Sequence, residues 1–215
     1  MAKGFRRKGR GSRARYAAQL DAVERRLLVT LLGQVATLLD PDGSISEGRS
    51  APGAAVAETT FDQIVAGLGG GPGGPAGDES ASHTGVRPDH DDPAVARLLP
   101  SGNVADEEAA AEFRRFTEDS LRRRKVAGLR RAMAVLGGAD DRLELGRDDA
   151  LALLVALTDV RLVLASRLGL ETDEDAERLH EVALRDDTDE QAAQAAAVYD
   201  FLTWLQETLA SCLTP

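Results

Sequence analysis

The chain has 215 residues, and its 36 aspartates and glutamates outnumber its 26 lysines and arginines, which gives a formal net charge of −10. With 43% hydrophobic but only 4% aromatic residues, it can bury about one domain-sized core, and that core must be mainly aliphatic. A single cysteine excludes a disulfide framework and any zinc site built from several cysteines. No stretch approaches the roughly 18 to 20 apolar residues of a membrane span, so we expect a soluble, cytoplasmic protein without membrane contact.

The first fifteen residues form a basic segment. They hold seven lysines and arginines and no acidic residue, so removing this +7 from the total leaves −17 on the rest of the chain. Because like charges repel one another and apolar residues are few, we predict that residues 1–15 form a disordered tail. Clustered cations of this kind can also bind the phosphates of a nucleic acid.

Apolar residues recur at helical spacing through much of the remaining chain. We predict helices at about residues 21–40, 105–136, 148–168, 175–183 and 190–211, with a short helical turn after Asp92 and an extended piece at 142–145. Asp21 and Glu24 have the spacing of a capping box. Residues 148–168 are apolar on almost every side, which is typical of a buried central helix, and Asp148 or Asp149 is its expected N-cap.

The composition shifts to glycine, proline, serine and aspartate between residues 41 and 92, which predicts a flexible insert. The chain shows no internal repeat and no alternating strand pattern. We therefore predict an all-α protein. Its single helical-bundle domain of five to six helices covers residues 16–213, is interrupted by the insert at about 41–92, and follows the disordered basic tail.

Four arginines of the second long helix are the best candidates for binding a partner or a phosphate group. Arg123, Arg124, Arg130 and Arg131 cluster opposite the apolar stripe of that helix and form one basic ridge. Guanidinium groups bind carboxylates and phosphates with two hydrogen bonds each. The same arginines can instead pair with the protein's own excess acid, and the sequence leaves both interpretations open.

Two charged residues fall inside the central helix, where a buried charge needs a partner. Asp159 and Arg161 are two positions apart and so do not face each other on a helix. We predict that they join a buried polar network with other elements. An arginine of residues 122–131 is the expected partner of Asp159, and Asp200 or Glu207 is expected for Arg161.

We find no signature of catalysis or of metal binding. His83 and His90 lie in a polar segment with nothing to orient their rings. Glu177 and His180 form only one of the two pairs that a di-iron site requires. Cys212 lies on the apolar stripe of the last helix, where a thiol behaves as a small hydrophobic group, and it is a weak redox candidate. We therefore expect a protein that is not an enzyme and needs no cofactor or metal.

Three segments together are similar to a known family: LRRRKVAGLRR at 121–131, ALTDVRLVLASRLGL at 156–170 and VYDFLTWLQETL at 198–209. They resemble an actinobacterial family of unknown function that is named for oxidative-stress transcriptional regulators of the AosR type and whose genes often neighbour that of the ClpS adaptor. The resemblance implies a cytoplasmic helical regulator of transcription. It also implies action through a protein partner such as a sigma factor or RNA polymerase.

One departure limits what the resemblance implies. A redox switch within one chain needs two thiols, and Cys212 is alone, which leaves an intermolecular disulfide, a different signal or a constitutive role. We expect a non-enzymatic regulatory protein that binds a protein partner, with a homodimer as a further option. The alternative is direct DNA binding through the basic tail and the arginine ridge.

Overall fold

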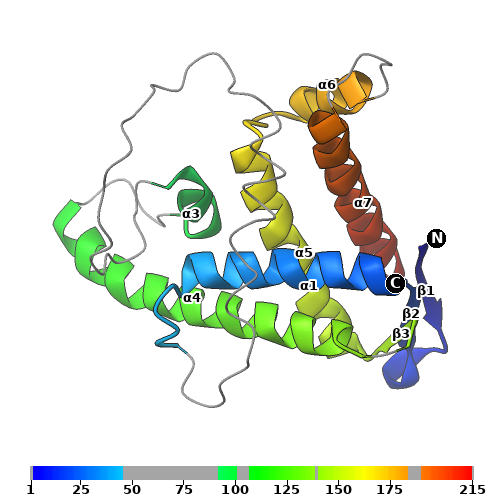
Figure 1. Ribbon diagram of the computed structural model, residues 1–215. Coiled ribbons are helices and arrows are strands. Elements are labelled where there is room, and N and C mark those ends of the chain that lie inside the picture. The colour runs from blue at the N-terminus through cyan, green and yellow to red at the C-terminus, as the bar shows by residue number, and fades with distance from the viewer. Residues whose placement is uncertain (1, 46–91, 101–106, 139, 184–189, 215) are drawn as a thin grey trace.

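The computed structural model describes residues 2–45, 92–100, 107–138, 140–183 and 190–214. These ranges contain a mostly helical fold with a small sheet at one end, close to both chain ends (Figure 1). The helices are α1 (Ala22–Leu39), α3 (Pro93–Leu98), α4 (Glu107–Leu136), α5 (Arg147–Arg167), α6 (Asp173–Ala183) and α7 (Glu190–Leu213). The strands are β1 (Lys3–Lys8), β2 (Arg15–Gln19) and β3 (Arg142–Leu145). Most of the expected insert at 41–92 lies outside the described residues.

The sheet corrects two expectations, the all-α fold and the disordered tail. Its strands are antiparallel in the order β1-β2-β3, with Arg6 opposite Ala17 and Ala17 opposite Glu144. The tail folds because it supplies Phe5, which is 4% exposed, to the core, and because Tyr16, directly after the tail, is fully buried. Burial of the two aromatic rings offsets the entropy cost of ordering this segment and the repulsion between its positive charges.

Helix α1 forms as its sequence predicts. The Asp21 side chain accepts hydrogen bonds from the backbone N–H groups of Val23 and Glu24, and the Glu24 side chain accepts one from the Asp21 N–H group. This is a complete capping box. The short helix α3 likewise begins at Asp92, whose carboxylate accepts from the N–H group of Ala94. Both predicted helix starts are confirmed.

Helix α5 differs from its prediction in two ways. Its N-cap is Gly146, and Asp148 and Asp149 instead lie in the first turn, where carboxylates favour the positive end of the helix dipole. The helix is also not buried on every side, because Leu151 is 40% exposed and Val155 is 53% exposed. The predicted end is correct, since the chain leaves the helix at Gly169 with a positive φ of 67°.

The helices pack around α5. Helix α1 lies along α4, α4 and α7 both contact α5, and β1 packs against α7. Figure 1 shows α5 passing behind α1, with α7 on the side of the sheet. Apart from Phe5 and Tyr16, the buried apolar side chains of the described residues are aliphatic, as the composition predicts. None of the described helices combines the length and apolar character that crossing a bilayer requires.

Candidate partner-binding site

The arginine ridge of α4 consists of Arg123, Arg124, Arg130 and Arg131. Two of these four arginines form ion pairs within the protein. Arg130 lies 3.0 Å from the carboxylate of Asp40, which follows the last residue of α1 and has a side chain only 2% exposed. Arg131 lies 2.7 Å from Asp149 in the first turn of α5. These two arginines therefore fasten α4 to the helices on its two sides, and half of the ridge pairs with the protein's own acid.

The other half of the ridge remains at the surface. Arg123 and Arg124 are exposed, and neither forms an ion pair or hydrogen bond with any described residue. They lie two turns before Arg130 and Arg131 on the same face of α4. An exposed arginine without an internal partner keeps its full set of donors for a ligand.

Beside the ridge, α5 carries an apolar stripe. Leu151, Val155, Thr158 and Leu162 are spaced four, three and four residues apart, so they lie along one face of the helix. Leu151 and Val155 are exposed, and Thr158 and Leu162 are half-buried. We call these four residues the α5 stripe. Its exposed apolar side chains are a feature that sequence periodicity missed, because the helix is apolar on nearly all sides and nothing in the pattern singles out one face.

Two ion pairs between α4 and α5 show how the ridge and the stripe lie relative to each other. Lys125 pairs with Asp159, and Arg131 pairs with Asp149, so the two helices run antiparallel side by side. By helical spacing, Arg124, Gly128 and Arg131 follow the edge of α4 that borders α5. At Gly128 an added Cβ atom would meet no atom within 4 Å, so this edge is open.

Helix α7 borders the stripe on its other side. Gln206 donates a hydrogen bond to Thr158 at 3.0 Å and accepts one from Arg161 at 2.9 Å. The α5 stripe therefore lies between α4 and α7, with arginine on one border and amides and hydroxyls on the other. An exposed apolar surface with a polar rim is typical of a protein-binding site.

The charged residues predicted inside α5 are anchored as internal structure. Asp159 is 2% exposed, and its carboxylate lies 2.5 Å from the ammonium group of Lys125. The partner thus comes from the expected segment, but it is a lysine and not an arginine. Burial raises the pKa of the Asp159 carboxyl above its ordinary value, and the Lys125 ammonium group opposes that rise.

Arg161 does not contact the acids expected for it. Its guanidinium donates to Gln206 and, at 3.4 Å, to the hydroxyl of Tyr199, whose ring lies 5.3 Å from the guanidinium carbon. Asp200 instead lies 2.6 Å from His180 and links α7 to α6, while Glu207 is exposed. The polar network therefore holds Arg161 through neutral groups, which the sequence does not distinguish from the nearby acids.

The remaining candidates from the sequence are the redox candidate Cys212 and the possible metal ligands. Cys212 is half-buried, and its thiol donates to the carbonyl of Phe5 at 3.2 Å. His83 and His90 lie outside the described residues. Among the residues that are described, no three histidine, cysteine, aspartate or glutamate side chains gather as metal ligands.

The sheet carries a second positively charged surface. The sequence did not predict it, because residues 1–15 were expected to be disordered. All seven cations of residues 3–15 are exposed on a folded hairpin, which we call the cationic hairpin. The missed signal was the pair of aromatic residues, Phe5 and Tyr16, at either end of the basic segment. They anchor the hairpin from its inner side.

Comparison with known proteins identifies a family and no closer relative. The model of the family described as "Domain of unknown function (DUF2017)" matches residues 2–213. No curated protein and no solved structure matches the chain. The match includes β1 and β2, so the cationic hairpin lies within the matched region.

Proposed function

We propose that this chain, which belongs to the DUF2017 family, is a non-enzymatic regulatory protein that binds a protein partner through the arginine ridge and the α5 stripe. The observation that supports the proposal most is the exposure of Leu151 and Val155 on a face of α5 next to the edge of α4 that carries Arg124 and Arg131. Exposed apolar side chains that lie together on one helix face, with polar side chains at their rim, are the kind of surface that binds a protein partner.

The chemistry of the surface favours an acidic amphipathic helix as the bound element. The apolar face of such a helix would cover Leu151 and Val155, and its acidic flank would meet Arg123 and Arg124. Apolar burial would supply affinity, and the arginines would set orientation and the rate of association.

The resemblance to AosR-type regulators suggests the process in which this partner takes part. It favours a cytoplasmic role in transcription under oxidative stress, with a sigma factor or RNA polymerase as the partner. Cys212 has no second thiol in the chain with which to form an intramolecular disulfide, so any redox signal would reach the protein through another molecule.

A pull-down with purified RNA polymerase and sigma factors tests the proposal. The variant Arg123→Gln/Arg124→Gln removes two exposed cations without breaking any ion pair of the described residues. We expect it to lose most of the bound partner, whereas Arg6→Gln/Arg10→Gln, with the same charge change on the cationic hairpin, should retain it. If both variants retain the partner equally, the ridge is not the contact surface.

A further inference from the structure

The cationic hairpin presents most of its charges on one surface, with Arg7, opposite the buried Tyr16, as an exception. Strand pairing places Arg6 opposite Ala17 and Lys8 opposite Arg15, so Arg6, Lys8 and Arg15 share the outer face of the sheet. The inner face carries Tyr16, Leu143 and other buried side chains. The cations are therefore held in fixed positions by a packed core, and binding a ligand would not have to order a flexible tail.

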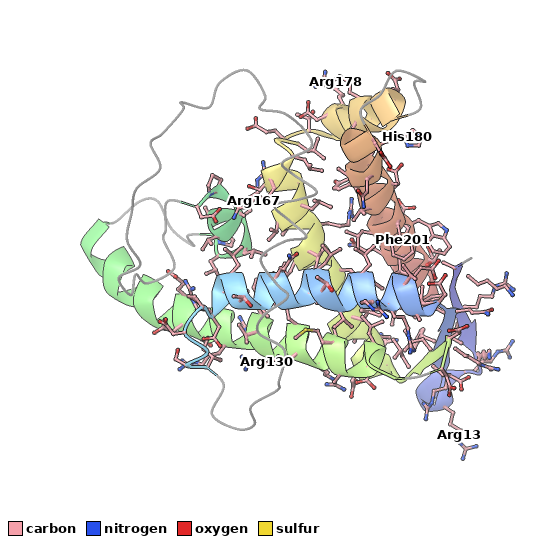
Figure 2. All side chains as sticks on the ribbon, in the orientation of Figure 1. Arg13, Arg130, Arg167, Arg178, His180 and Phe201 are labelled. Carbon is pink, nitrogen blue, oxygen red and sulfur yellow. The ribbon has the colours of Figure 1, made fainter. Side chains whose placement is uncertain are left out.

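The outer end of the hairpin extends past the third strand. Tyr16 is opposite Leu145, the last residue of β3, whereas β1 and β2 continue pairing to Lys8 and Arg15. Beyond that pair, the turn carries Arg10 and Arg13. Figure 2 shows Arg13 at the outer end of the sheet, pointing away from the helices. The projecting part is thus the last pair of the hairpin, Lys8 and Arg15, and the turn beyond it, with cations on both strands and at the tip.

Little acid neutralises this surface. Glu144 lies 3.5 Å from Lys8 and 3.5 Å from Arg142, and the three side chains are 46% to 64% exposed. In contrast, Arg6, Arg10 and Arg13 form no ion pair within the described part of the chain. Residues 1–20 contain no acidic residue at all. Most of the hairpin charge is therefore available to an anionic ligand.

We propose that the outer end of the cationic hairpin binds the phosphate backbone of duplex DNA, with the turn facing the major groove. The major groove of B-form DNA is about 12 Å wide and admits two paired strands, so the end of a hairpin fits it. The major groove of an RNA duplex is too narrow for side chains to enter. The inference goes beyond the proposed protein partner and uses a different surface.

Burial of the aromatic side chains argues against other anionic ligands. Proteins that bind single-stranded nucleic acids stack the bases on exposed aromatic rings, and helices that lie on membranes add inserted apolar side chains to their cations. Phe5 and Tyr16, the two aromatic residues of this region, face the core instead. The surface offers charge and shape without a stacking platform, which matches a duplex backbone.

The charge of the rest of the chain would orient the complex. Outside residues 1–15 the net charge is −17, so the body of the protein repels DNA while the hairpin attracts it. The protein would then meet DNA at one end and keep the α5 stripe free for a protein partner.

Fluorescence anisotropy with the full chain and a labelled DNA duplex tests this inference across a series of salt concentrations. The variant Arg6→Gln/Arg10→Gln/Arg13→Gln removes three unpaired hairpin cations. The control Arg26→Gln/Arg167→Gln/Arg178→Gln removes three exposed helical cations that lie outside both the hairpin and the arginine ridge. We expect log K to fall linearly with log salt for the unaltered chain, with a slope of about −0.9 per phosphate contact, and the hairpin variant should lose about one unit of slope per contact removed. The control should keep the slope.

Equal melting temperatures for the two variants would show that the comparison is between folded proteins. The inference is wrong if the unaltered chain does not bind the duplex at low salt, or if the two variants lose binding equally. It is also wrong if single-stranded DNA, an RNA duplex of the same length or vesicles of anionic lipid bind more tightly than the DNA duplex. None of these results bears on the protein partner, which the pull-down tests separately.

Discussion

The backbone N–H group of Phe5 donates a hydrogen bond to the hydroxyl of Thr208, 203 residues further along the chain, at 3.2 Å. The Thr208 hydroxyl in turn donates to the carbonyl of Leu205 within α7. The neighbouring thiol of Cys212 donates to the carbonyl of Phe5. Strand β1 is thereby joined to the last helix by side chains that satisfy both polar groups of one buried backbone unit, as such groups require.

The close contact between Gly4 and Thr208 predicts the effect of a single methyl group. A Cβ atom at Gly4 would lie 2.7 Å from Cγ2 of Thr208, so Gly4→Ala should lower the free energy of unfolding by about 1 to 3 kcal/mol. Urea unfolding measures the loss. Adding Thr208→Ser, which removes the methyl group and keeps the hydroxyl, should restore much of it.

Gly128→Ala is the matched control. Its Cβ atom meets open space within a helix, so this substitution should raise stability by up to about 1 kcal/mol. If Gly4→Ala were as harmless as Gly128→Ala, β1 would not pack against α7 as described.

This contact also explains why the hairpin could not be predicted from sequence. Residues 1–15 contain little that folds locally, and the groups that hold Phe5 come from α7, at the far end of the chain. Local composition therefore indicated disorder. The capping box of Asp21 and Glu24, by contrast, was predictable because all its atoms lie within four consecutive residues.

The candidate site was predictable in part for the same reason. Helical periodicity places the four ridge arginines on one face of α4, which needs no tertiary information. Which of them remain available depends on Asp40 and Asp149, supplied by helices on either side. Likewise, the exposure of Leu151 and Val155 depends on how α4 and α7 flank α5, which no local pattern encodes.

The buried pair of Lys125 and Asp159 should respond in opposite ways to single and double substitution. Asp159→Ala leaves Lys125, whose side chain is 15% exposed, without its partner and should cost about 3 kcal/mol of stability. The double variant Lys125→Met/Asp159→Leu replaces the pair by apolar groups and should be close to the unaltered protein or more stable. Chemical denaturation of the unaltered protein, the single variant and the double variant measures these differences in the free energy of unfolding. A double variant that loses as much as the single one would show that the pair itself stabilises the fold.

The raised pKa of Asp159 predicts the sign of a pH effect. Between the ordinary value of 3.8 and the raised value, the folded state holds a proton that the unfolded state has lost. The contribution of Asp159 to the free energy of unfolding therefore falls as the pH rises through that window.

Unfolding measured from about pH 4 to pH 7 isolates this effect when the unaltered protein is compared with Lys125→Met/Asp159→Leu. The free energy of unfolding of the unaltered protein minus that of the double variant should become smaller as the pH rises. A difference that increases with pH would mean that Lys125 outweighs burial and holds the pKa below its ordinary value.

The most direct test of partner binding is the affinity of the α5 stripe for the partner that the pull-down retains. Leu151→Gln/Val155→Gln alters two exposed side chains, and Val23→Gln, at a side chain 74% exposed on α1, is the matched control. We predict that the stripe variant weakens the complex by at least about tenfold, a loss of about 1.4 kcal/mol, while the control binds as tightly as the unaltered chain. Equal affinity for all three proteins would contradict the proposed function.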